Sequence, residues 1–264
     1  MSTGPATATA STFRDGFELG RLDPARWVPA YLPQWTTPDR AAARHRMDAG
    51  RLILEIDADT LPWCPDHDGE TRVSSIQTGV RSGPVGGADG QHRFAADVRV
   101  VTEQPPRRLY VPRFGRIAIR ANALADPRAM VALWMIGFED RPEDSGELCV
   151  MEIFGRDVAA DRVAVGMGVH PHHDPRLRDD FARVELAIDA TRAHDYAVEW
   201  RPDGIRWSVD GTVVRTSGQS PAYGMQLMLG IYAFEPVGEG EAPLAFAVER
   251  VTGDPVPGEA SGDA

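Results

Sequence analysis

Hydrophobic and polar residues alternate in short runs along most of the chain, a pattern typical of β-strands with one buried face. The expected strands are residues 51–57, 72–78, 92–101, 114–121, 130–136, 147–154, 163–169, 184–188, 194–200, 205–209, 212–215, 225–232 and 244–251. Asp210-Gly211 separates two of these runs and is a strong hairpin signal. The pattern predicts an all-β, two-sheet antiparallel sandwich. One short helix is expected near residues 39–46, with Asp39 as its N-cap.

The composition favours a single domain. The 264 residues are 42% hydrophobic, and 21 prolines and 26 glycines are spread along the chain, as expected for many short elements joined by turns. We find no repeat and no low-complexity linker. The expected domain spans residues 12–251, with disordered tails at 1–11 and 252–264, where small and polar residues dominate.

The charge and the cysteine content limit the classes of partner and the cellular location that we expect. The formal net charge of −11 repels phosphate backbones and anionic lipids, so we expect neither nucleic acid nor membrane as a partner. A neutral poly- or oligosaccharide is compatible with this charge, and a monomer is expected. The N-terminus lacks the features of a secretory signal, which favours a cytoplasmic location and leaves export by another route, or prior removal of a signal, open. Cys64 and Cys149 are interpreted as buried free thiols.

Two carboxylates lie in a run that is otherwise apolar enough for a core strand, Gly146 to Phe154. On a regular strand Glu147 and Cys149 would share one face, and Glu152 would point to the other. A β-bulge after Cys149 would return Glu152 to the first face and place all three side chains in a row. The alternative is an edge strand on which both glutamates are solvated.

Several other segments occur in an order that resembles glycoside hydrolase family 16, the laminarinase and lichenase group. The family motif Glu-x-Asp-x-x-Glu resembles Glu147-Leu-Cys-Val-Met-Glu152. The further matching segments are 13–27, 114–120 (Phe-Gly-Arg-Ile-Ala-Ile-Arg), 132–136 (Ala-Leu-Trp-Met-Ile), His170 after an apolar run, 194–200 (His-Asp-Tyr-Ala-Val-Glu-Trp), 205–211 (Ile-Arg-Trp-Ser-Val-Asp-Gly) and 225–230 (Met-Gln-Leu-Met-Leu-Gly). Together they cover residues 13 to about 250.

The resemblance implies a concanavalin A-like jelly roll and a retaining, endo-acting hydrolase of a β-linked glycan, of the β-glucan or β-galactan type. By position in the motif, Glu147 resembles the nucleophile and Glu152 the acid/base, and retaining enzymes hold these groups about 5–5.5 Å apart. No cofactor is expected. The residues expected to bind substrate are Trp134, His170, Trp63, Trp200 and Gln226, although any Trp of a sandwich can instead belong to its core.

The chain departs from the family pattern at three places. Cys149 stands where the family has Asp, which leaves three interpretations: an enzyme with a retuned pair of glutamates, an enzyme with lost or weakened activity, or a thiol that acts only as a small buried hydrophobe. Arg141-Pro142 replaces a common Trp-Pro, and Gly230 replaces a common Asn. These two changes affect the expected substrate more than the expected fold.

Two other functions remain open on the same fold. They are a non-catalytic carbohydrate-binding protein and a transglycosylase that transfers the sugar to another sugar. The run from His170 to Asp174 contains three histidines, but ligands this close in sequence, with Pro171 between two of them, rarely complete a zinc shell. We therefore expect no metal site.

Overall fold

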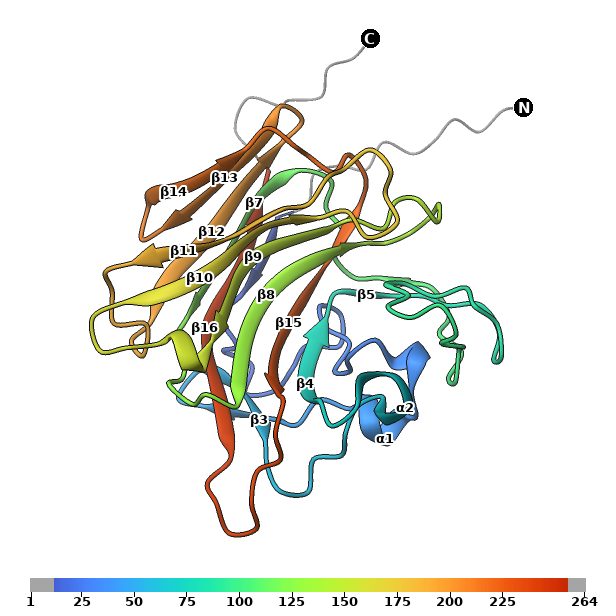
Figure 1. Cartoon of the computed structure of the whole chain (residues 1–264), viewed down its shortest axis with the longest axis horizontal. Helices are drawn as coiled ribbons and strands as arrows, with labels where there is room; N and C mark the ends of the chain where they lie inside the picture. The colour runs from blue at the N-terminus through green and yellow to red at the C-terminus, as the bar shows by residue number, and fades with distance from the viewer. Residues whose placement is uncertain (1–11, 256–264) are drawn as a thin grey trace.

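The computed structural model describes residues 12–255, which form two large antiparallel sheets packed face to face (Figure 1). The larger sheet has the order β14-β13-β12-β7-β16-β3-β2, and β1 pairs with β16. Its strands are β1 (Phe13–Asp15), β2 (His45–Asp48), β3 (Arg51–Ile56), β7 (Gly115–Ala121), β12 (His194–Arg201), β13 (Gly204–Val209), β14 (Thr212–Ser217) and β16 (Leu244–Asp254). This architecture confirms the predicted β-sandwich.

The smaller sheet has the order β11-β10-β9-β8-β15-β4 and carries the segment with the two glutamates as its strand β9. Its strands are β4 (Arg72–Gln77), β8 (Ala129–Gly137), β9 (Glu147–Phe154), β10 (Val163–His170), β11 (Asp180–Leu186) and β15 (Met225–Ala233). The remaining elements are the strand pair β5 (Gly79–Val80) and β6 (Arg107–Arg108), the helices α1 (Pro38–Ala41) and α2 (Pro65–Asp68), and the 3-10 turns η1 (Pro33–Trp35) and η2 (Gly155–Asp157).

The main core lies between the two sheets. It takes alternate residues from both, such as Ile117 and Val198 of the larger sheet and Val131 and Leu148 of the smaller one. Removing each of these aliphatic side chains from water stabilises the folded state by about 1.5–3 kcal/mol. The alternation visible in the sequence is therefore the signature of this shared interior.

A second apolar cluster covers the other face of the smaller sheet, which we call the outer face. Trp134 and Cys149 project from the strands, while Tyr31, Trp35 and Trp63 come from the segments that precede β2 and β4. Loops therefore cover part of the outer face.

Twelve of the thirteen expected strand runs contain strands, and the exception is 92–101. Val98 and Val100 of that run are buried against the outer face, but they lie on a loop. Its alternation reflects burial on one side without pairing.

The ends of two predicted elements also differ. Helix α1 ends at Ala41 and has Thr37, not Asp39, at its N-cap, because residues 45–48 pair with β3 instead of continuing the helix. Strand β16 continues to Asp254, three residues beyond the predicted domain end at 251. Residues 1–11 and 256–264, where tails were predicted, lie outside the described residues. No helix within residues 12–255 has the length and apolarity to cross a membrane.

Candidate active site

A β-bulge follows Cys149, where the alignment of the two glutamates requires one. On β8, Leu133 pairs with Met151 and Trp134 with Cys149, so Val150 is an extra residue in β9. The pairing of β9 with β10 shifts at the same point. Val150 and Met151 both enter the main core, whereas Cys149 belongs to the outer-face cluster. Glu147 and Glu152 consequently line one cavity, and the edge-strand alternative is excluded, since β9 pairs on both sides.

The facing sheet satisfies a backbone group at this bulge. The indole Nε1 of Trp207, on β13, donates a hydrogen bond of 2.7 Å to the carbonyl oxygen of Cys149. Both residues are buried, and an unpaired carbonyl in such a place would cost about 1–3 kcal/mol. Trp207 therefore stabilises the irregular strand geometry that brings the glutamates together.

Glu147 is held as a carboxylate by two donors. Its Oε2 lies 2.9 Å from His172 Nε2, and its Oε1 accepts a hydrogen bond of 2.9 Å from the Cys149 thiol. Burial raises the pKa of Glu147, but these hydrogen bonds and the neighbouring imidazoles outweigh it, so the pKa lies below its usual range. Glu147 is ionised at neutral pH.

The pKa of Glu152 is shifted in the opposite direction. Burial, and then the negative charge of Glu147, raise the pKa of Glu152 to about 7, although His170 and Arg183 oppose the shift. One carboxylate is thus ionised and its neighbour keeps a proton near neutrality. Two carboxyl groups with separated pKa values are the arrangement that a nucleophile and a general acid need.

Cys149 lies beside Glu147 as a neutral thiol. Burial, followed by the charges of Glu147 and Glu152, raises the pKa of Cys149 well above its usual range. The thiol therefore donates a hydrogen bond to Glu147 and has little thiolate available for attack. The buried, free state predicted for Cys64 and Cys149 is confirmed.

This contact predicts the outcome of two substitutions at Cys149. Cys149→Ser keeps a donor of similar size and should change kcat/KM by less than about tenfold. Cys149→Asp adds a charge beside both glutamates and should shift the pH optimum, with activity changed within about one to two orders of magnitude. Initial rates across a pH series check both variants. If Cys149→Ser lowers turnover as fully as Glu147→Gln does, the thiol takes part in the chemistry.

Aromatic side chains form one wall of the cavity, which has a volume of about 210 Å³. Trp134 lines it, and its Nε1 donates a 2.9 Å hydrogen bond to the hydroxyl of Tyr232. Tyr31 and Phe234 complete the aromatic surface, while Asp68 and Thr71 add polar groups from the segment around α2. Such a mixture suits a sugar, which has apolar C–H faces and hydroxyl edges.

We call Glu147 and Glu152 the reactive pair. The structure brings only two of the five predicted substrate-binding residues close to this pair. Trp134 lines the cavity, and a nitrogen of His170 lies within 4.8 Å of ligand atoms of Glu147 and Cys149. Trp63 is buried behind Tyr31, with ring centroids 4.7 Å apart, and supports the wall from behind.

Trp200 and Gln226 require correction. Trp200 projects from β12 into the core between the sheets, where its Nε1 donates to Ser220 and Pro221. Trp200 therefore packs in the core and does not bind substrate. Gln226 is fully buried and accepts a 2.7 Å hydrogen bond from Gln91, so it does not line the cavity.

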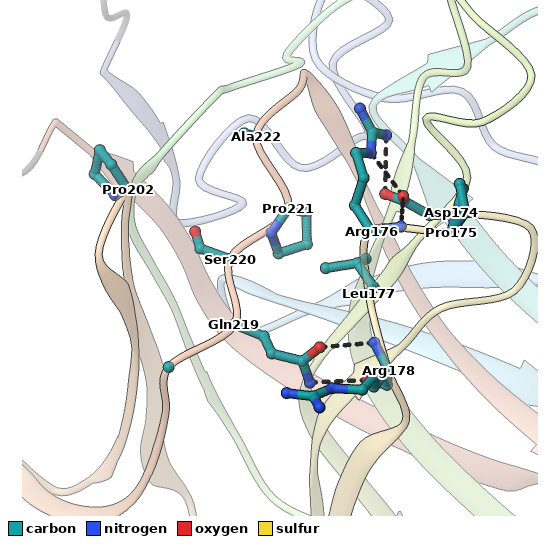
Figure 2. A pocket seen from close by; sticks show the side chains of 11 residues that line it. Asp174, Pro175, Arg176, Leu177, Arg178, Pro202, Gln219, Ser220, Pro221 and Ala222 are labelled. Carbon is teal, nitrogen blue, oxygen red and sulfur yellow. Dashed lines mark hydrogen bonds and ion pairs between the residues drawn. The ribbon is translucent and has the colours of Figure 1, made fainter.

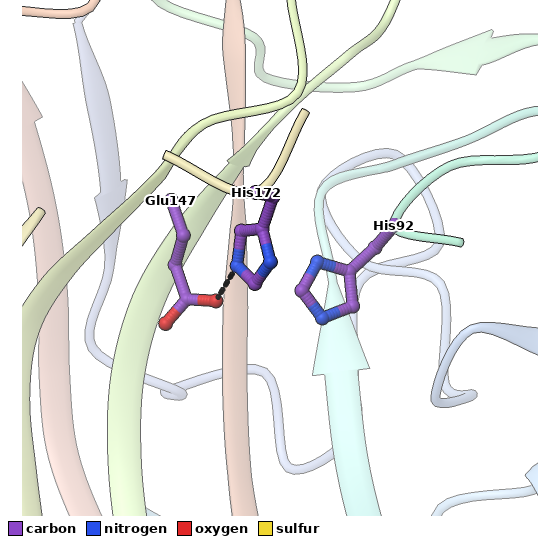
Figure 3. Close-up of side chains that lie close together, drawn as sticks. All are labelled: His92, Glu147 and His172. Atoms are coloured by element: carbon purple, nitrogen blue, oxygen red, sulfur yellow. Dashed lines mark hydrogen bonds and ion pairs between the residues drawn. The ribbon is translucent and has the colours of Figure 1, made fainter. Parts of the chain in front are cut away.

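Sequence reasoning missed His172 and His92 as neighbours of Glu147. His172 lies on the loop after β10, and this loop folds back so that His172 contacts Glu147 of β9. His92 approaches from a distant segment, and its ring centroid lies 4.7 Å from that of His172 (Figure 3). The sequence could have indicated Tyr232, because it follows Gly230 by two residues and therefore lies on the same face of the strand.

The loop that carries His172 is fixed by a buried polar network. Arg176 contacts the carboxylates of Asp174 and Asp144, and the Tyr223 hydroxyl donates to Asp174 while accepting from the backbone N–H of Gly146. Gly146 directly precedes Glu147. The network therefore links the loop to the start of β9 and keeps His172 in register with Glu147.

A separate cavity of about 480 Å³ adjoins this network and is lined by Asp174 to Arg178 and by Gln219 to Ala222 (Figure 2). Its single carboxylate, Asp174, is already paired with Arg176 and Tyr223. Gln219 closes it by exchanging two hydrogen bonds with the backbone of Arg178. These groups serve the loop, and the cavity lacks a reactive pair.

A third cavity has a volume of about 630 Å³ and is lined in part by residues next in sequence to the two histidines. Arg93 and His173, the chain neighbours of His92 and His172, line it together with Glu139 and Pro142. Pro142 belongs to the Arg-Pro pair that replaces the family's Trp-Pro. Burial raises the pKa of Glu139 to about 7.

Comparison with known proteins identifies relatives of this fold and site. A family model, "Glycosyl hydrolases family 16", matches residues 110–238. A β-glucanase from Rhodothermus marinus is 32% identical over 107 residues, which are 38% of this chain and 36% of that protein. A GlcNAcα1-4Gal-releasing endo-β-galactosidase from Clostridium perfringens is 27% identical with a TM-score of 0.80, covering 96% of this chain and 64% of the other. A laminarinase from Flavobacterium sp. UMI-01 has a TM-score of 0.63 at 16% identity, covering 93% of this chain and 100% of the other, and shows the fold alone.

The fold is a β-jelly roll similar to those of the endo-β-galactosidase and the laminarinase. The family match over residues 110–238 confirms the resemblance to glycosyl hydrolase family 16 seen in the sequence. The chain spans about a third of the length of the β-glucanase and under two thirds of the endo-β-galactosidase.

Proposed function

We propose that this protein is a retaining, endo-acting glycoside hydrolase of a β-linked glycan, with Glu147 as nucleophile and Glu152 as acid/base. The observation that carries the proposal is the separation of the two pKa values on one face of β9: Glu147 below its usual range and Glu152 at about 7. Glu147 attacks the anomeric carbon while Glu152 protonates the departing oxygen. Glu152 then removes a proton from water, which releases the sugar from Glu147.

Two cavities support an endo mode. Glu147 and Glu152 line the aromatic cavity, and the chain neighbours of His92 and His172 line the larger one. A chain bound across both would present an internal bond to the glutamates.

Galactose-containing chains are the substrates that we place first. The endo-β-galactosidase from Clostridium perfringens has higher identity and a higher TM-score than the laminarinase, although the β-glucanase keeps β-glucans in the comparison. Gly230 lies behind the aromatic cavity, and a Cβ there would come within 2.8 Å of Ser75 Cβ and 3.2 Å of the hydroxyl of Tyr232, which lines the cavity. The cleft therefore differs from the family pattern at the positions expected to select the sugar.

The test is mass spectrometry of products from a panel of β-1,3-glucan, mixed-linkage glucan, β-galactan and GlcNAcα1-4Gal-capped galactose chains. Hydrolysis releases shorter oligosaccharides, with galactose-containing chains cut fastest. Products longer than the substrate would instead establish a transglycosylase. Binding to a glycan without any cleavage would establish a carbohydrate-binding protein and overturn the proposal.

Retention of anomeric configuration is the expected stereochemical outcome. Two carboxyl groups on one strand that share a small cavity leave little room for a water molecule between Glu147 and the anomeric carbon. Proton NMR during the first minutes of hydrolysis, before mutarotation, should show the β-anomer of the new reducing end. Initial appearance of the α-anomer would contradict a covalent intermediate on Glu147.

A further inference from the structure

Three side chains with metal-binding atoms meet at Glu147 from three separate parts of the chain. They are Glu147 on β9, His172 on the loop after β10, and His92 on the loop that follows β5 (Figure 3). One ligand atom of each lies within 4.8 Å of the other two. Glu147 and His172 are already in contact at 2.9 Å, and the rings of His92 and His172 meet edge to face.

Small side-chain movements would bring the three ligand atoms to the spacing that a tetrahedral ion requires. Zn²⁺ binds imidazole nitrogen and carboxylate oxygen at about 2.0–2.2 Å, which places neighbouring ligand atoms about 3.4 Å apart. Closing the largest separation therefore takes rotations that move an atom by at most about 1.4 Å, which side chains can make by small changes of χ angle. Two imidazoles and one carboxylate also form the ligand set of several catalytic zinc sites, with the fourth position left for water.

His92 has no competing partner for its ring. Among residues 12–255, its backbone N–H donates to Glu139, but neither ring nitrogen makes a hydrogen bond. The ring instead packs edge to face on Trp134, with centroids 5.2 Å apart, and on His172. An imidazole held in this way beside a carboxylate and a second imidazole leaves a nitrogen available as a ligand.

We propose that His92, Glu147 and His172 form a binding site for a divalent transition-metal ion such as Zn²⁺ or Cu²⁺. Nitrogen ligands favour these ions, whereas Mg²⁺ and Ca²⁺ prefer shells of oxygen only. The bound ion takes the Glu147 oxygen that His172 now contacts. If the proposed function holds, the occupied site is inactive, because the nucleophile is bound to metal. The binding itself does not depend on that function.

A second set of three groups shares Glu147 and must be distinguished. Glu147, Cys149 and His170 also have ligand atoms within 4.8 Å of one another. Cys149 is fully buried and donates its proton to Glu147, so this set would have to lose a thiol proton before it could bind an ion. We therefore assign the ion to the set with two histidines.

The experiment is isothermal titration of the full chain with Zn²⁺ in a non-chelating buffer. The expected result is one ion per chain and no binding of Mg²⁺. His92→Phe keeps a ring against Trp134, removes the ligand and should weaken binding by more than about 100-fold, since even partners outside the ligand shell are worth about 10- to 100-fold. His173→Ala removes the adjacent histidine of the same loop, which has no ligand atom in the set, and should bind as the wild type does.

Binding that is unchanged in His92→Phe, or lost in Cys149→Ser but not in His92→Phe, would overturn the assignment. Absence of stoichiometric binding to the wild-type chain would overturn the site altogether. With Cu²⁺, electron paramagnetic resonance should show coupling to two nitrogen nuclei, reduced to one in His92→Phe. If hydrolysis is established, added Zn²⁺ should inhibit it and EDTA should restore it, whereas the binding result stands whether or not a substrate is found.

Discussion

Glu147→Gln is expected to lower kcat by roughly four to six orders of magnitude, the range found when a nucleophile or its base is removed from a covalent catalyst. The amide fills the same space and can still contact His172 and Cys149, but it cannot attack the anomeric carbon. Hydrolysis rates on the best glycan of the panel measure the loss. The thermal unfolding midpoint should remain near that of the wild type, which separates lost chemistry from lost folding.

Chemical rescue distinguishes a nucleophile from a residue that only shapes the site. Glu147→Gly opens space beside the anomeric carbon, so added azide should restore turnover and give a glycosyl azide of inverted configuration. The same anion should not rescue turnover if Glu147 has only a structural role. Failure of rescue in a folded variant, with a sugar that has a reactive leaving group, would contradict the assignment.

Glu152→Gln is expected to lower kcat/KM on a natural glycan by about 10²- to 10⁴-fold, the usual contribution of a general acid. Formation of the glycosyl-enzyme from an aryl glycoside with an acidic phenol should be affected far less, because that leaving group departs without a proton. Burst kinetics on the aryl glycoside measure this step. Equal losses on both substrates would show that Glu152 does not protonate the leaving group.

The pH profile follows from the same two groups. Glu152 must be protonated, so kcat/KM should fall as the pH rises through about 7. Glu147 must be ionised, so the acid limb should lie below the usual carboxylate range. Glu139, whose pKa is also about 7, provides a matched control. Glu139→Gln should keep the alkaline limb, and its disappearance in that variant would reassign the limb to Glu139.

The sandwich could be predicted from the sequence because burial on one face of a strand imposes a period of two. That rule identifies strands with one buried face, such as β13 and β16. It fails for residues 92–101, where alternate apolar side chains pack from a loop. It also gives little signal for β5 and β6, which are too short to show a period.

The reactive pair was predictable for a different reason. Glu147 and Glu152 have five-residue spacing, so they can share a face only across a bulge, and the resemblance supplied the motif in which they do. The contacts that tune the pair were not predictable. His92 and His172 are remote from each other in sequence, and they meet Glu147 only because two loops fold over the outer face. Nor does a local pattern indicate that Trp207 binds the carbonyl of Cys149 across the sandwich.

The central claim, that Glu147 is the nucleophile, is tested most directly by trapping the covalent intermediate. The reagent is a 2-deoxy-2-fluoro glycoside of the sugar identified by the panel, with a good leaving group. The fluorine slows both formation and breakdown of the glycosyl-enzyme, whereas the leaving group speeds only its formation, so the intermediate accumulates. Mass spectrometry of the intact protein should show one added glycosyl group, and fragmentation of the peptide that carries both glutamates should place it on Glu147. A label on Glu152 or Cys149, or turnover of the reagent with no label in the active enzyme, would contradict the account.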